Sequence, residues 1–477
     1  MIHHAATNVR TIFKFTGLGY MMATSLTRSL VKLLAKPVDQ KTCQRATLHL
    51  LDWIGCSVIG TQQPAGHILV DRSSGLPKGN LSSIGACALA SPEDAVFLNG
   101  GLGSILEMDD VHRTAILHPG PVVIPAALAS AQLNNASGLG FLRAITKGYE
   151  AAIRVGESVG KGHYEKWHNT STCGPFGAAI ATGEILDLTD DQFVWALGNA
   201  GTQSSGLWRC RHENVMAKQL HTARAAQSGY LAASLAASGF TGSEFILEGE
   251  QGFYDAMCPN AQPARLLENW DGPWKIWDTS FKPWPACRHA HPAIDATLGF
   301  NTAICPEHIE AIKVDTYEDA KKFCDCKQPA TSQQAKFSIQ HAVAICFIKG
   351  PPKLEYFETE DLEDPVIAQL RNVISINVGK EFENAYPAHF GASVTVYFKN
   401  GRSQKAIIRD ALGDPENPVT SDQIIEKART LMVAVDLSDQ IIDQVVTETL
   451  SLPHAASLEN FTAALNTLCS HLKRGTG

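Results

Sequence analysis

Along about the first 275 residues, apolar side chains recur at the spacing of amphipathic helices. Leucines lie three or four positions apart between residues 25 and 35, and Pro37 ends that run. The segment Ser91-Pro92-Glu93-Asp94 is typical of a helix start, since proline fits the first turn and acids favour the N-terminal end. This pattern predicts an all-helical unit with further helices over 41–59, 95–105, 122–133, 139–158, 174–185, 190–200 and 215–238.

The pattern changes to strand-like alternation further along the chain. Residues 309–314 and 373–378 alternate apolar with polar side chains, and 393–398 and 404–408 flank an Asn-Gly pair that is typical of a tight hairpin. One helix, 335–347, is expected between these strands. Helical spacing returns after Pro418, where it predicts a helix that ends at Met432 and a last helix over 458–472.

These patterns predict a mainly α fold, in which a large all-helical domain carries an inserted, smaller α+β lid domain. The expected organisation is an N-terminal extension at 1–21, the first part of the helical domain at 22–278, the lid at 279–412 and a return to the helical domain at 413–477.

The chain is poor in charge. Only 18% of its 477 residues are charged, against roughly 25% in ordinary soluble domains, so we expect much of the surface to be buried. The 48 acidic and 40 basic residues give a net charge of −8 without a basic block, which argues against nucleic-acid binding. No apolar run approaches the roughly 18 residues of a membrane helix. We therefore expect a soluble protein with neither nucleic-acid nor membrane partners.

The N-terminal segment allows two interpretations. No acidic residue precedes Asp39, while basic residues stand at Arg10, Lys14, Arg28, Lys32 and Lys36. This composition is typical of a mitochondrial transit peptide. The simpler interpretation is an upstream start codon, because Met21 and Met22 come directly before the first helix. We favour the simpler one, which predicts a cytoplasmic protein, with the mitochondrial matrix as the alternative.

The cysteines indicate free thiols rather than a disulfide framework. Twelve are scattered over a long chain, which favours a reducing compartment. The close pair Cys324-Asp325-Cys326 is too tightly spaced for the usual zinc or iron–sulfur motifs. No glycine-rich phosphate loop follows a predicted strand either. We therefore expect no structural metal.

The densest chemistry lies in the segment 107–118. Three carboxylates, two histidines and an arginine fall within twelve residues, namely Glu107, Asp109, Asp110, His112, Arg113 and His118. A solvated helix end is the ordinary interpretation of such an acidic run. The cluster can also bind a metal, but no second carboxylate–histidine set with complementary spacing accompanies it. His118 lies in a Pro/Gly turn, where a buried core histidine is not expected.

Three other groups add basic and polar side chains. The polar stretch 167–174, which contains His168, precedes a small-residue helix and predicts either an anion site or ordinary capping. Lys218 and His221 lie in a small-residue segment, where a buried lysine is costly unless it is paired or functional. The stretch 281–292 at the predicted domain junction holds Lys282, Cys287, Arg288 and His289. Together these groups favour a small polycarboxylate ligand.

The sequence also resembles the MmgE/PrpD family, which includes 2-methylcitrate dehydratase and cis-aconitate decarboxylase. The resemblance begins near residue 22 and rests on segments 50–55, 97–100, the acidic cluster with His118-Pro119, His168, 218–221, 281–283 and 413–418. It implies a homodimer of helical domains, each with an α+β lid, and a site at the domain junction without metal or cofactor. The family's active-site positions match at Asp109 or Asp110, His118, His168, Lys218 and Lys282.

Two departures from the family pattern leave the substrate open. Relatives commonly have an aspartate, an aromatic residue and further acids ending in threonine where this chain has Glu107 to His112. A relative's histidine is replaced by Cys287, with Arg288 and His289 beside it.

Our leading hypothesis is a cofactor-independent hydro-lyase that removes water from a 2-methylcitrate-like acid. His118 is expected to be the main acid/base and His168 a second proton donor. Lys218 and Lys282 are expected to bind carboxylates, and Asp109 or Asp110 to orient a histidine. Further substrate contacts are expected from Glu107, His112, Arg113, His221, Cys287, Arg288 and His289. The alternatives are decarboxylation of cis-aconitate to itaconate, epimerisation of an imino-dicarboxylate, and a non-catalytic scaffold, which buried lysines disfavour.

Overall fold

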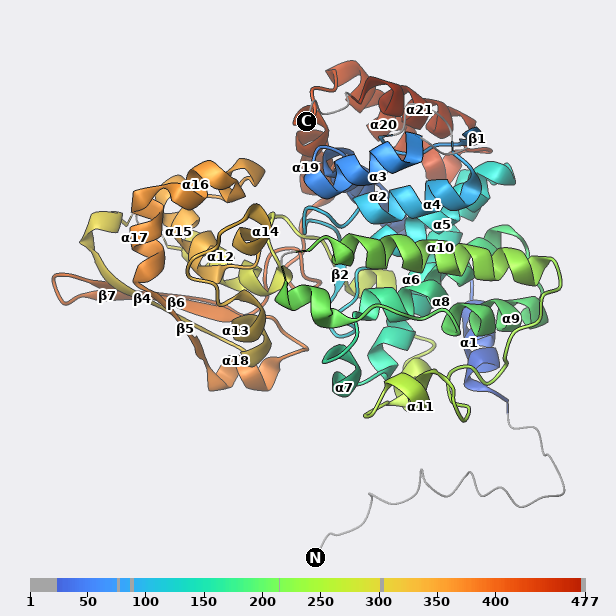
Figure 1. The fold of residues 1–477 in the computed structure, drawn as a ribbon, viewed down its shortest axis with the longest axis horizontal. Coiled ribbons are helices and arrows are strands. Elements are labelled where there is room, and N and C mark those ends of the chain that lie inside the picture. The colour runs from blue at the N-terminus through green and yellow to red at the C-terminus, as the bar shows by residue number, and fades with distance from the viewer. Residues whose placement is uncertain (1–23, 75–77, 86–89, 214, 301–303, 473–477) are drawn as a thin grey trace, which may run out of the picture.

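The protein consists of a larger helical part and a smaller part with a sheet, which lie side by side (Figure 1). The computed structural model describes residues 24–74, 78–85, 90–213, 215–300 and 304–472. The fold is mainly α, which confirms the predicted class. The proposed targeting segment and the alternative start lie outside the described residues.

The larger part holds the first eleven helices, and the last three helices return to it. Its helices are α1 (Leu26–Leu34), α2 (Gln40–Gly60), α3 (Pro64–Ser74), α4 (Pro92–Leu102), α5 (Gly120–Leu133), α6 (Gly138–Ser158), α7 (Lys161–Tyr164), α8 (Asn169–Ile185), α9 (Asp190–Gly201), α10 (Ala217–Ala237), α11 (Phe253–Met257), α19 (Ser421–Val433), α20 (Asp439–Ser451) and α21 (Glu459–His471). Short strands are β1 (Lys78–Leu81), β2 (Val111–His112) and β3 (Thr279–Ser280).

The smaller part packs short helices around a four-stranded sheet. Its strands are β4 (Ile309–Thr316), β5 (Ile374–Val378), β6 (Ala392–Phe398) and β7 (Ser403–Ile408), in the order β5-β4-β6-β7. β4 and β5 are parallel, and the other two pairs are antiparallel. Its helices are α12 (His291–Leu298), α13 (Glu318–Cys324), α14 (Ser332–Lys336), α15 (Ile339–Lys349), α16 (Thr359–Glu363), α17 (Pro365–Asn372) and α18 (Lys380–Ala385).

Two sequence predictions for the smaller part differ from the structure. Five helices, α13 to α17, lie between β4 and β5, where we predicted one. The predicted helix 335–347 is also two helices, because the Ser338 hydroxyl accepts a hydrogen bond from the His341 N–H and begins a new helix there. Helices of five to eight residues are too short to show a clear helical period.

Small residues let the central helices pack closely. A Cβ added at Gly229 of α10 would lie 2.4 Å from the Ala178 Cβ on α8, and one at Gly100 of α4 would lie 3.0 Å from the Ala226 Cβ on α10. The glycine-rich segment of α4 is therefore a helix-packing surface. This packing holds the N-terminal end of α10, which carries Lys218, against the rest of the larger part.

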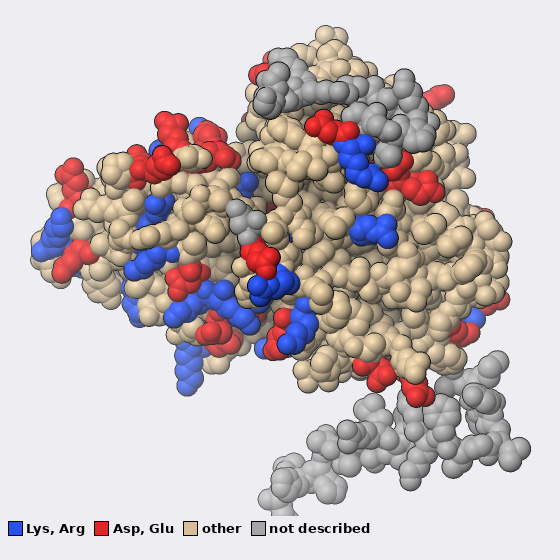
Figure 2. Space-filling model, in the orientation of Figure 1, with Lys and Arg blue, Asp and Glu red and all other residues tan. Residues whose placement is uncertain are grey.

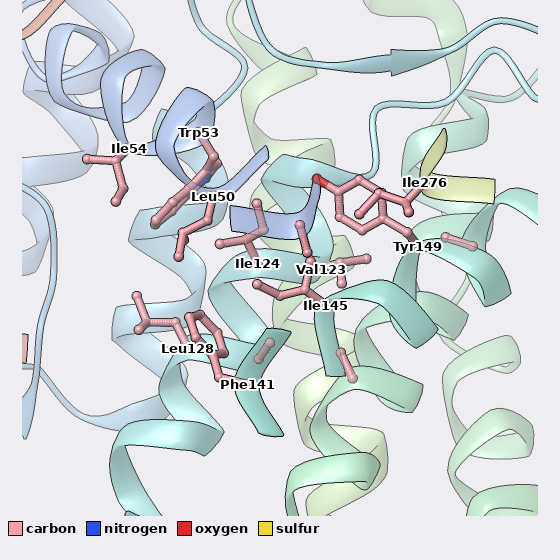
Figure 3. Close-up of a cluster of buried hydrophobic side chains, with 14 of the residues drawn as sticks. Leu50, Trp53, Ile54, Val123, Ile124, Leu128, Phe141, Ile145, Tyr149 and Ile276 are labelled. Carbon is pink, nitrogen blue, oxygen red and sulfur yellow. The ribbon is translucent and has the colours of Figure 1, made fainter. Parts of the chain in front are cut away.

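The main hydrophobic core joins helices from both ends of the chain. Leu50 and Trp53 of α2 lie beside Val123 of α5 and Ile145 of α6, all nearly or fully buried (Figure 3). The C-terminal residues Ala428, Leu431 and Met432 of α19 belong to the same core, whereas the buried residues of the smaller part form a second one. Burial of this apolar area is the main stabilising contribution to each part.

Charged side chains are scarce on part of the surface as well as in the buried cores. On the face in Figure 2, Lys, Arg, Asp and Glu are sparse over the larger part and more frequent on the smaller part. Two leucines of α10, Leu220 and Leu231, are 49% and 38% exposed. Burial alone therefore does not explain the charge deficit. In the described part of the chain, every cysteine is a free thiol, and no helix has the length and apolar character needed to cross a membrane.

The loop 410–417 connects the two parts through one buried carboxylate. Asp414 accepts hydrogen bonds from Arg113, at 3.1 Å, and from the Ser280 hydroxyl, at 2.6 Å, and it pairs with Arg288. Gly413 stands at φ +94°, where the Phe281 N–H donates to its carbonyl and a Cβ would lie 2.0 Å from the Phe281 oxygen. Glycine is therefore required at this crossing.

We predict that Gly413→Ala lowers the melting temperature much more than Gly401→Ala. Gly401 in the β6–β7 hairpin also has a positive φ, of +79°, but no atom lies within 4 Å of an added Cβ. Gly401→Ala, the control, therefore destabilises the fold only by the cost of a left-handed backbone conformation, about 1–2 kcal/mol. Gly413→Ala adds a steric overlap of its Cβ with the Phe281 backbone. Thermal denaturation of both variants checks this, and equal losses would contradict it.

Candidate active site

A cavity of about 600 Å³ opens where the two parts meet. The larger part contributes Glu107, His118, His168 and Lys218 to its lining, and the smaller part contributes Cys287, His289 and Phe337. The sequence predicted a site at this junction, and the cavity brings together residues far apart in the chain.

A short strand pairing places two of the predicted clusters face to face. β2 pairs antiparallel with β3, so that Val111 lies opposite Ser280. The acidic segment that precedes β2 therefore lies against Lys282, which follows β3. Because backbone hydrogen bonds join the two strands, the acidic side chains before β2 and Lys282 after β3 are held at a defined separation.

Two carboxylates and two ammonium groups form a buried network at this point. Lys218 donates a hydrogen bond to Glu107, and the Lys282 Nζ lies 3.8 Å from Glu107 and 3.4 Å from Asp109. Glu107, Asp109 and Lys282 are at most 2% exposed. Removing one member would leave the remaining charges buried without balance, which is strongly unfavourable.

His118 is the titratable group next to this network. Its Nδ1 lies 2.8 Å from the Asp109 carboxylate, and neither of these two atoms has another hydrogen-bond partner among the described residues. The side chain lines the cavity. A carboxylate at one imidazole nitrogen orients the ring, as in histidines that donate or accept a proton.

The backbone is strained at two positions in the segment that precedes His118. Glu107 has φ +58° and Ile116 has φ +47°, and both residues line the cavity. A positive φ is unfavourable for any residue with a Cβ and most of all for a β-branched one. Such strain persists only where the surrounding structure imposes it, and it concentrates at functional sites.

Burial and the neighbouring charges set the protonation states. Burial works to raise the pKa of Glu107, but Lys218 and Lys282 outweigh it and the pKa is lowered. The pKa of Asp109 is likewise far below its ordinary value, because His118 and Lys282 overcome the effect of burial. Burial and the charge of Lys218 hold the pKa of His168 well below its ordinary value. Both carboxylates are therefore ionised at neutral pH, and His168 is uncharged.

Five of the expected site residues do not line the cavity: Asp109 and Lys282, which belong to the buried network, and Asp110, His112 and His221. Asp110 is buried behind it, 2.6 Å from the Tyr149 hydroxyl and 2.7 Å from the His49 Nδ1. The His112 Nδ1 accepts a hydrogen bond from the Ala115 N–H at 3.3 Å, and burial lowers the pKa of this histidine to about 4. His221 lies 3.2 Å from His168. Of the two aspartates considered as the partner of a histidine, Asp109 is next to His118, and Asp110 contacts His49.

The two arginines of the predicted site line the cavity, but carboxylates already pair with them. Arg113 contacts Asp410, Asp414 and Glu416, and Arg288 pairs with Asp414. The charges of these two arginines therefore fix the position of the loop 410–417, which connects the two parts.

Side chains of the polar stretch 167–174, for which the sequence predicts either an anion site or ordinary capping, contact the segment that leads to His118. α8 begins at Asn169, so most of this stretch lies within its first two turns. The Thr170 hydroxyl accepts a hydrogen bond from the His118 N–H at 3.1 Å, and the Asn169 amide donates to the Ala115 carbonyl. These contacts position His118.

Among the described residues, one group could hold a metal ion, namely His389, Asp410 and Glu416, with ligand atoms within 4.8 Å of one another. Arg113 already donates hydrogen bonds to both carboxylates. A guanidinium group therefore occupies the position where a cation would be needed.

Sequence reasoning missed several residues that line the cavity, including Tyr164, Trp208, Arg211, Phe323 and Lys336. The aromatic residues among them pack around the histidines. The ring centroids of Trp208 and His168 lie 4.3 Å apart, and the Phe323 ring stacks on His289. Their local sequence resembles that of ordinary core residues, so no pattern distinguished them.

Two models of one protein family match successive stretches of this chain, and the second extends beyond the smaller part through α19 and α20. The model of the MmgE/PrpD N-terminal domain matches residues 24–266, and that of the MmgE/PrpD C-terminal domain matches residues 284–451. The chain belongs to the MmgE/PrpD family.

Three relatives match over nearly their whole length. The cis-aconitate decarboxylase-like protein oryM of Aspergillus oryzae is 27% identical over 465 residues, which cover 90% of this chain and 95% of the relative. The cis-aconitate decarboxylase of Aspergillus terreus is 24% identical, over 83% of this chain and 86% of its own. The human cis-aconitate decarboxylase is 24% identical, over 86% of this chain and 88% of its own.

We predict that acidification destabilises the protein through its buried histidines. Burial lowers the pKa of His163 from 6.5 to about 4 in the folded state. The unfolded chain therefore binds more protons between about pH 4 and 6.5, and stability falls as the pH falls through that window. This one group should cost about 2 kcal/mol at about pH 5.

The measurement compares thermal denaturation at neutral and mildly acidic pH. His163→Gln should reduce the loss of melting temperature on acidification, whereas His308→Gln, at an exposed position, should leave it as in the unsubstituted protein. An unchanged pH slope in His163→Gln would contradict the assignment.

Proposed function

We propose that this protein is a lyase of a small polycarboxylate, in which His118 transfers a proton at a carbon next to a carboxylate. The observation that carries the proposal is that His118 lines the cavity between the two parts and pairs with Asp109, which lies behind it beside Lys282. Family membership supports the substrate class. No organic cofactor is required for this chemistry.

Decarboxylation of an unsaturated tricarboxylate of the cis-aconitate type is our first candidate. In that reaction, a carbon of the double bond takes a proton, the bond to one carboxylate breaks, its electrons form the new double bond, and carbon dioxide leaves. Protonated His118 can supply the proton. The aromatic residues Trp208, Phe323 and Phe337 in the cavity lining favour this reaction, because a carboxylate loses carbon dioxide more readily when water is excluded. Relatives named as decarboxylases support the same choice.

Dehydration of a 2-methylcitrate-like acid is the second candidate. It needs a base for the carbon-bound proton and an acid for the departing hydroxyl group. Neutral His118 can act as the base, and the ammonium group of Lys218, which also lines the cavity, can act as the acid. The same two groups can also move a proton on and off one carbon, as epimerisation of an imino-dicarboxylate requires.

The deciding experiment incubates the purified protein with cis-aconitate, methylcitrate, citrate and iminodisuccinate, with and without a chelator, and follows the products by NMR. We expect carbon dioxide release and an unsaturated dicarboxylate from the first acid, unchanged by the chelator. Loss of activity in chelator would contradict metal-independent catalysis. No turnover of any acid would favour a scaffold.

His118→Gln should lower turnover of the accepted acid by at least about a hundredfold, since general acid–base catalysis contributes about 10²–10⁴. His471→Gln, at an exposed position on α21, is the matched control and should keep full turnover. Near-normal activity of His118→Gln would exclude this residue as the proton-transfer group.

The family resemblance also implies a homodimer. The sparsely charged surface over α10 supports it, because a surface buried between subunits has little use for charged side chains. Mass measurement in solution should give twice the mass of one chain, and a monomer would contradict this prediction.

A further inference from the structure

The cations predicted to bind substrate carboxylates are already paired with the protein's own acids. Lys218 and Lys282 face Glu107 and Asp109, and Arg113 and Arg288 face the carboxylates of the loop 410–417. Two carboxylates balance the two lysines, so this part of the site carries no excess positive charge at neutral pH unless His118 is protonated. A polycarboxylate therefore needs a further cation in the cavity.

Lys336 meets that requirement. It is the last residue of α14, lines the cavity and is only 2% exposed. Among the described residues, no hydrogen bond or ion pair reaches its Nζ. Burial without such a partner lowers the pKa of this lysine, and Glu358 and Glu107 offset the effect only in part. A buried ammonium group of this kind is unfavourable until an anion binds to it.

The surrounding contacts connect the backbone of Lys336 to cavity residues of both parts. Its carbonyl accepts a hydrogen bond from the Cys287 N–H at 2.8 Å, and Cys287 also lines the cavity. The ring of the next residue, Phe337, lies 5.7 Å from the Lys218 Nζ. The backbone around Lys336 is therefore held against both parts of the site.

We propose that Lys336 binds a substrate carboxylate remote from the carbon at which His118 transfers the proton. The ligand class is then an acid with at least three carboxylates, one of which pairs with this lysine. The assignment rests on the proposed function for the nature of the ligand, but it is tested by binding alone, without turnover.

The test measures binding of two unreactive acids, tricarballylate and glutarate, which differ by one carboxylate. The unsubstituted protein should bind tricarballylate more tightly. Lys336→Met should weaken tricarballylate binding about 10- to 100-fold, the range of a hydrogen bond between charged groups, and should reduce the preference for it over glutarate. Lys336→Arg should restore part of the preference, and Lys380→Met, at an exposed position, should change neither affinity.

Thermal denaturation separates this role from a structural one. Lys336→Met removes a buried charge that has no protein partner, so its melting temperature without ligand should be equal to or above that of the unsubstituted protein. A clear drop in melting temperature, equal losses for both acids, or no tricarballylate binding by the unsubstituted protein would each overturn the assignment. If the preference is lost as expected but no acid is turned over, the proposed reaction fails and the carboxylate site remains.

Discussion

The buried network of Glu107, Asp109, Lys218 and Lys282 is the constraint on which the site depends. Its members come from a strained loop before β2, the first turn of α10 and the segment after β3. Charges of this kind tolerate burial only when all of them are present, so the network requires these three segments to meet in one arrangement. His118 is oriented by Asp109, a member of that network, and its position therefore follows from the same arrangement.

A second group of charges connects the two parts of the protein. Asp414 contacts Arg113 of the larger part and Arg288 of the smaller part, beside the close backbone crossing of Gly413 and Phe281. This connection lies next to the cavity, because both arginines also line it. The relative placement of the parts and the shape of the cavity are thus controlled by the same side chains.

Pairing with protein carboxylates distinguishes the cations of these two groups from Lys336. Lysines and arginines paired with protein carboxylates hold the architecture, while an unpaired one is available for an anionic ligand. From the sequence, all of these lysines and arginines are expected to bind substrate. Their pairing with protein carboxylates indicates instead that most of them hold segments of the protein together. It also explains how a chain with a net charge of −8 can present a positive group to an acid, since local pairing determines which charges remain free.

The sequence by itself determined the mainly α class, the long helices, the Asn-Gly hairpin and the segments that carry the chemistry. Each of these depends on local patterns, such as helical spacing in α2 or the acidic cluster before β2. The short helices between β4 and β5, the separation of Asp109 from Asp110 and the pairing of Arg113 with Asp414 were decided only by the tertiary structure. Adjacent residues in an irregular loop can point into different environments, and a charge is free or paired according to partners hundreds of residues away. Lys336 belongs to this second group, because its burial and its lack of a partner exist only in the folded chain.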